Sequence, residues 1–95
     1  MRVLLTVDAR ADIRTIRERR AEFSPGRADD LVLELLRRLR QIRDFPRLGR
    51  IVPELQHEDL REVLEQGYRI IYQVFPDRAE VFAVLHSRQD IRPPR

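Results

Sequence analysis

The sequence contains no cysteine, no lysine and no hydrophobic run long enough to cross a membrane. Without cysteine the chain cannot form a disulfide framework, a thiolate zinc site or a cysteine nucleophile, and this composition fits a reducing compartment. The apolar start, residues 1–7, is too short for the core of a signal peptide, and Asp8 follows it directly. We therefore expect a soluble, cytoplasmic protein with no membrane partner.

General catalytic signatures are also missing. The chain has no glycine-rich phosphate loop and no nucleophile elbow. His57 stands near Glu54, Glu58 and Asp59, but these residues lack the helical spacing of a metal-ligand set. We expect neither a metal site nor a cofactor. The length of 95 residues predicts one compact domain, residues 1–95.

Every basic residue of the chain is arginine. Genomic base composition explains most of this bias, although arginine is also the better fork for phosphate and carboxylate groups. The charge is unevenly distributed, because residues 1–50 hold 13 arginines and 8 acids whereas residues 51–95 hold 6 arginines and 8 acids. The first half should therefore present the main surface for an acidic partner.

The stretch 68–75 is rich in β-branched and aromatic residues, which predicts a strand. Its even-numbered side chains are apolar and should face a core, while the odd-numbered side chains, Arg69 and Gln73 among them, should form a mixed, open face. Pro76-Asp77 predicts a tight turn into a second strand over 79–86. On that strand, Phe82 and His86 should share the open face with Arg69.

The first half of the chain predicts two amphipathic helices. After a strand over 1–7, Asp8 can cap a helix over 9–23, whose buried stripe is Ala9, Ile13, Ile16 and Phe23. Ser24 and Pro25 are typical of a helix start, and a second helix should run from 25 to 44. So short a link predicts an antiparallel helical hairpin.

The second helix carries the best candidates for a partner surface. Leu33 points away from the apolar stripe, toward Arg37 and Arg40. Several arginines follow up to Arg50, and only Asp44 is an acid near them in sequence. Phosphate binding is one interpretation of this run, and a solvated helix end is the commoner one. The candidate partner-binding residues are Leu33, Arg37, Arg40, Arg43 and Arg50.

A further strand is expected over 60–65, although its two faces are ambiguous. The predicted order is therefore β-α-α-β-β-β. Consecutive strands joined by short turns pair antiparallel. We expect an α+β fold in which an antiparallel helical hairpin packs on one face of a small, mainly antiparallel β-sheet.

Several short motifs occur in a familiar order along nearly the whole chain. They are Ala9-x-x-Asp12-Ile13, Phe45-Pro46-Arg47-Leu48-Gly49-Arg50, Val52-Pro53-Glu54, Leu60-Arg61-Glu62, residues 67–74, and Val84-Leu85-His86-x-Arg88-x-Asp90. In this order they resemble the RelE/ParE superfamily of toxins from type II toxin–antitoxin systems. The resemblance implies a helical hairpin on a small antiparallel sheet, and a cognate antitoxin as partner.

Two activities are implied by this resemblance. ParE-like members poison DNA gyrase and are not enzymes of RNA cleavage, whereas RelE-like members cut mRNA on the ribosome. We favour the ParE-like interpretation and keep an endoribonuclease of the RelE or YoeB type as the alternative. An inactive binding module on the same fold is a further alternative.

If the chain were a nuclease, the resemblance would assign it a basic cluster. Arg69 matches the strand arginine of that cluster, Arg88 and Arg61 match further basic positions, and Glu54 or His86 would be the general base. The family often has two successive arginines where this chain has Arg88-Gln89. We expect Arg69, His86 and Arg88 to lie together at one end of the open sheet face.

Overall fold

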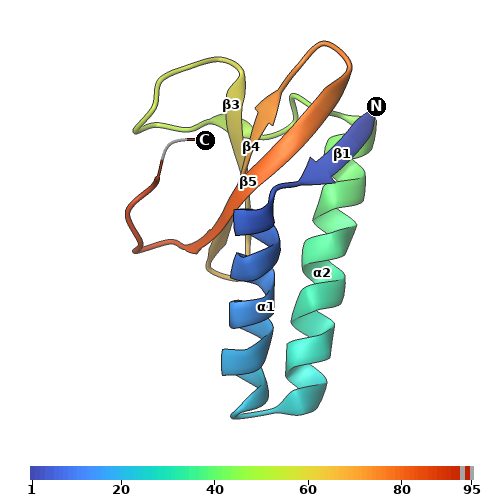
Figure 1. The fold of residues 1–95 in the computed structure, drawn as a ribbon, viewed down its shortest axis with the longest axis vertical. Coiled ribbons are helices and arrows are strands. Elements are labelled where there is room, and N and C mark those ends of the chain that lie inside the picture. Colours follow the sequence, from blue (N-terminus) through green and yellow to red (C-terminus); the bar gives the residue numbers. More distant parts are fainter. Residues whose placement is uncertain (93, 95) are drawn as a thin grey trace.

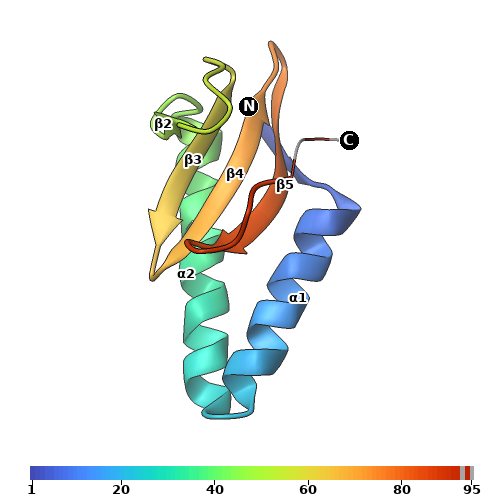
Figure 2. The ribbon, with the colours of Figure 1, turned by 90° about the vertical axis from the view of Figure 1, so that its left-hand side faces the viewer.

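The computed structural model describes residues 1–92 and 94, and its two helices lie against one face of a twisted sheet (Figures 1 and 2). The predicted α+β fold is confirmed. Within the described residues, no helix is both long and apolar enough to cross a membrane. The elements in chain order are β1 (Arg2–Leu5), α1 (Val7–Ala21), α2 (Pro25–Asp44), β2 (Arg50–Ile51), β3 (Leu60–Glu65), β4 (Tyr68–Val74) and β5 (Arg78–His86).

The five strands are arranged in the order β1-β5-β4-β3-β2. The strands from β2 to β5 pair antiparallel with their neighbours, as the short connections between β3, β4 and β5 require. β1 instead pairs parallel with β5, because the chain passes through both helices before it returns to the sheet. β4 is therefore the central strand, and the mainly antiparallel sheet agrees with the prediction.

The two helices differ in how well the sequence predicted their starts. α2 begins at Pro25, where the Ser24 hydroxyl accepts a hydrogen bond from the backbone N–H of Arg27 at 3.4 Å. α1 begins at Val7, two residues earlier than predicted, because the Thr6 hydroxyl rather than Asp8 accepts the N–H of Ala9 at 3.1 Å. α1 ends at Ala21, two residues before Phe23, which is 87% exposed, so the predicted burial of Phe23 is wrong.

The main core lies between the helices and the sheet. The even-numbered face of β4 is directed into it, as predicted, with Ile70, Tyr72 and Val74 packed against buried residues of α2 such as Leu31 and Leu35. Tyr72 also anchors the segment that follows α2. Its hydroxyl donates to the carbonyl oxygen of Pro46 at 2.6 Å and accepts the N–H of Gly49 at 3.1 Å.

Replacing Val74 with alanine should lower the free energy of unfolding by roughly 1–3 kcal/mol, because the side chain fills part of this core. Gln73→Ala is the matched control on the same strand. Gln73 points to the opposite face and is half-buried, so its loss should cost less than about 0.5 kcal/mol. Urea melts of the two variants measure their free energies of unfolding. A larger loss for Gln73→Ala than for Val74→Ala would contradict the assignment of the faces of β4.

The second face of the sheet is covered, so its prediction as an open face is wrong. A smaller core forms there from Val52, Ile71, Phe82, Ala83 and Leu85, with Leu55, Leu60 and Ile91 packed against it. Leu55 comes from the loop between β2 and β3, Leu60 is the first residue of β3, and Ile91 lies in the segment after β5. The alternation of a strand shows which side chains share a face, but it does not show whether a loop folds over that face.

Candidate functional site

Arg69 lies on the covered face at only 6% exposure, between two carboxylates. Its Nε donates to Glu62 Oε1 at 2.5 Å, and its Nη2 lies 3.1 Å from Glu62 Oε2. The same guanidinium donates to Glu54 through Nη1 at 2.7 Å and Nη2 at 3.0 Å. Arg50 adds a second cation, with its Nε 2.9 Å from Glu62 Oε2. All three nitrogens of the Arg69 guanidinium are thus engaged by carboxylates.

Strand pairing brings these charges together. Glu62 of β3 is paired with Ile71 of β4, so Arg69 is its diagonal neighbour on the same face. The Glu62 side chain is fully buried, whereas Glu54 is half exposed in the loop after β2. Arg69 therefore fastens this loop across the sheet.

The contacts between Arg69 and the carboxylates favour the charged forms of Glu54 and Arg69. The hydrogen bond from Arg69 lowers the pKa of Glu54 despite an opposing desolvation effect. Hydrogen bonds to Glu54 and then to Glu62 raise the pKa of Arg69 further above its ordinary value. Glu54 with a lowered pKa is a weak general base. Arg69 would have to break carboxylate contacts before it could donate to a phosphate.

The lowered pKa of Glu54 predicts acid-sensitive stability. A carboxylate whose pKa is lowered by folding stabilises the protein above its ordinary pKa, and this contribution is lost as pH falls through the lowered value. Stability should therefore begin to fall as the pH drops below about 4. In thermal melts between neutral and acid pH, the melting temperature of Glu54→Gln should fall less steeply with pH than that of the parent protein. An identical acid profile in the two proteins would contradict this role of Glu54.

His86 does not lie beside Arg69, so the predicted cluster of Arg69, His86 and Arg88 on one open face is wrong. The pairing of β4 and β5 shifts between Ile71 and Tyr72, and Phe82 is the unpaired residue. This bulge reverses the alternation of β5 beyond it, and His86 turns to the side of Tyr68. The two rings meet edge to face, with their centroids 5.8 Å apart.

Arg88 and Arg61 are also separate from the Arg69 cluster. The backbone N–H of Arg88 donates to His86 Nδ1 at 3.3 Å, within the turn that follows β5. Arg61 is paired with Tyr72 on the helix side of the sheet, and it donates to the carbonyl oxygens of Glu58 at 2.7 Å and Gly49 at 3.1 Å. Of the five candidate catalytic residues, all of which the structure describes, only Glu54 and Arg69 have side chains that bond to each other, and His86 and Arg88 meet only through the Arg88 backbone.

Most arginines near the end of α2 are paired with acids, which corrects the expectation that only Asp44 is near them. Arg37 contacts Glu34 at 2.8 Å and Glu65 at 3.8 Å, and Arg50 contacts buried Glu62. Glu62 and Glu65 are distant in sequence and Glu34 lies on the preceding helical turn, so a count of acids within the arginine run missed them. Arg43 contacts Asp44, as the sequence indicated.

Leu33 and Arg40 remain accessible among the candidate partner-binding residues. Leu33 is 63% exposed, as predicted. Within the part of the chain that the structure describes, the Arg40 side chain has neither an ion pair nor a hydrogen bond. The exposed side of α2 therefore carries an apolar residue and, two turns further along, a cation that has no acidic partner among the described residues.

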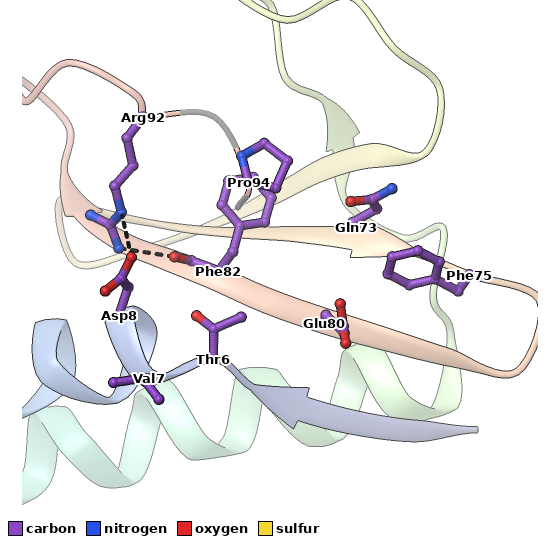
Figure 3. Close-up of a pocket in the computed structure, with 9 residues that line it drawn as sticks. All are labelled: Thr6, Val7, Asp8, Gln73, Phe75, Glu80, Phe82, Arg92 and Pro94. Atoms are coloured by element: carbon purple, nitrogen blue, oxygen red, sulfur yellow. Dashed lines mark hydrogen bonds and ion pairs between the residues drawn. The ribbon is translucent and has the colours of Figure 1, made fainter.

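Sequence reasoning missed Arg92, which fastens the C-terminal segment to α1. Its Nη2 lies 2.6 Å from Asp12 Oδ2 and donates to the carbonyl oxygen of Phe82 at 2.9 Å. Figure 3 shows Arg92 reaching toward Asp8 at the start of α1, with their nearest charged atoms 3.8 Å apart. A pocket of about 390 Å³ lies beside these residues. Asp12 belongs to the motif Ala9-x-x-Asp12-Ile13, and its presence there was the one sequence signal that could have indicated this contact.

A family profile and a solved structure both match this chain. The family profile described as "ParE toxin of type II toxin-antitoxin system, parDE" matches residues 3–91. A similar solved structure is entitled "Chromosomal ParDE TA system from P. aeruginosa". It has 17% sequence identity and a TM-score of 0.76, and the match covers 90% of this chain and 95% of that one. No curated protein sequence matches the chain.

Proposed function

The chain belongs to the ParE toxin family of type II toxin–antitoxin systems, and we propose that it arrests growth in the bacterial cytoplasm by acting on DNA gyrase, without cleaving RNA. A cognate antitoxin is its partner. The sequence motifs indicated the superfamily as a whole, in which both activities occur, so the choice of target rests on the geometry of the candidate catalytic residues.

The arrangement of Arg69 and His86 carries the proposal. A ribonuclease of this kind needs a cation that is free to stabilise the phosphorane and a base that removes the proton of the 2′-hydroxyl. Here Arg69 is held by two carboxylates, and His86 lies on the opposite side of the sheet. A gyrase poison needs no proton transfer, so this arrangement is compatible with it.

Purified protein and purified gyrase test the proposal. With supercoiled plasmid, the toxin should increase the fraction of DNA that is trapped in covalent gyrase complexes. The same preparation should leave mRNA intact on programmed ribosomes. Gyrase complexes at the background level, together with cut mRNA, would replace the proposal by the RelE-like alternative. Inactivity in both assays of a toxin that arrests growth would point to another target.

For the antitoxin, we propose contact with the exposed side of α2. Leu33 offers an apolar anchor and Arg40 an uncompensated cation, which together fit an acidic segment that orders on binding. Leu33→Asp should weaken co-purification of the antitoxin. Unchanged complex formation by Leu33→Asp would exclude this surface.

A further inference from the structure

The helical hairpin extends beyond the sheet, and its free end overhangs the turn between β3 and β4 (Figures 1 and 2). A hollow of about 370 Å³ lies on this overhanging part. The side chains around it come from the end of α1, the link between the two helices, the start of α2 and the first residue of β4. They are Arg19, Arg20, Phe23, Ser24, Arg27 and Tyr68.

The cations around this hollow lack carboxylate partners. Among residues 1–92 and 94, no acid forms an ion pair with Arg19, Arg20 or Arg27, although many other arginines of the chain are paired. The dipole of α1 favours Arg19 and Arg20, which lie in its last turn. Arg27 lies in the first turn of α2, where the dipole disfavours a cation. The stability of the helix therefore does not explain why position 27 is an arginine.

The same hollow has an aromatic border. Phe23 is 87% exposed, since the sheet formed by β1 to β5 ends short of this part of the hairpin (Figures 1 and 2). Half-buried Tyr68 lies on the other side of the hollow. An exposed ring between arginine forks combines the two elements that bind single-stranded nucleic acids. The guanidinium groups engage the phosphates, and an unpaired base stacks on the ring.

We propose that this hollow binds a single-stranded polynucleotide. Arg19, Arg20 and Arg27 contact consecutive phosphates, and Phe23 stacks against a base. A peptide of acidic residues alone would match the charge but would leave the exposed ring without a stacking partner. A double helix keeps its bases stacked on one another and offers this ring only its backbone. The proposal goes beyond the gyrase assignment and does not depend on it.

Fluorescence anisotropy of the purified toxin, with no gyrase present, tests this site. The probes are a labelled DNA strand, the RNA strand of the same sequence, the DNA duplex and a polyglutamate peptide. Single strands should bind more tightly than the duplex and the peptide, and the DNA and RNA arms show which sugar is preferred. Phe23→Ala should weaken single-strand binding by about tenfold.

Arg27→Glu separates binding from stability. It should weaken single-strand binding and reduce the slope of log affinity against log salt by about one or more. Its melting temperature should rise, because an acid suits the first turn of α2. Arg40→Glu is the matched control, since it removes an unpaired arginine of α2 outside the hollow, and it should have the smaller effect on binding.

Three results would overturn the proposal. The first is wild-type affinity in both Phe23→Ala and Arg27→Glu. The second is an equal loss of affinity in Arg40→Glu, which would mean that net charge alone attracts the strand. The third is tighter binding of polyglutamate than of either single strand, which would assign the hollow to an acidic protein segment. None of these results would affect the gyrase assay.

Discussion

Arg69→Ala should be strongly destabilising, with a loss of about 3–5 kcal/mol in the free energy of unfolding. The substitution leaves the fully buried carboxylate of Glu62 without its closest cation. Arg50 still contacts Glu62, but its side chain is 57% exposed and cannot replace the buried fork. The loop that carries Glu54 also loses its attachment to the sheet. Denaturant melts of the purified variant measure the loss.

Two controls distinguish the loss of this buried ion-pair cluster from the loss of a positive charge anywhere on the protein. Arg17→Ala removes an exposed ion pair with Asp29 and should cost less than about 1 kcal/mol. The double variant Arg69→Met with Glu62→Leu removes both buried charges, and it should recover most of the stability that Arg69→Ala loses. If Arg69→Ala were as stable as Arg17→Ala, Arg69 would not be the residue that fastens the loop.

Gly49→Ala should cost about 2–4 kcal/mol. A β-carbon at this position would lie 2.6 Å from the backbone carbonyl oxygen of Glu62 and 2.7 Å from the Tyr72 hydroxyl. The backbone must therefore move, which costs typically about 1–3 kcal/mol. The movement also weakens the hydrogen bond from the Gly49 N–H to Tyr72, worth about 1 kcal/mol.

Gly26→Ala is the matched control for this substitution. A β-carbon at Gly26 meets no atom within 4 Å, and the position lies in the first turn of α2. The free energy of unfolding of Gly26→Ala should equal that of the parent or exceed it by up to about 1 kcal/mol, because alanine loses less backbone conformational entropy on folding than glycine does. Equal stability of the two variants would contradict the close contact at Gly49.

Local sequence signals predicted much of the fold. The Ser24-Pro25 start of α2, the apolar stripe that contains Leu31 and Leu35, and the even-numbered face of β4 all follow from periodicity and capping within one element. The start of α1 was misplaced because Thr6 and Asp8 are both good caps. Only the folded chain shows that Thr6 holds the Ala9 N–H.

The candidate site was predicted less well, because it depends on contacts between distant residues. A single unpaired residue, Phe82, reverses the face of His86, and no local signal marks that bulge. The carboxylates of Glu54 and Glu62 reach Arg69 through a loop and a neighbouring strand. The motifs indicated the family correctly, but they did not indicate which of their charged residues pair with one another.

Growth arrest by His86→Gln tests the central claim most directly. The variant and the parent are induced at equal levels in bacteria, and covalent gyrase–DNA complexes and the 5′ ends of ribosome-bound mRNA are measured in both cultures. We predict growth arrest and gyrase-linked DNA breaks with either protein, because the proposed action on gyrase requires no proton transfer by His86. Cleaved mRNA with the parent, together with loss of both cleavage and toxicity in His86→Gln, would contradict the account.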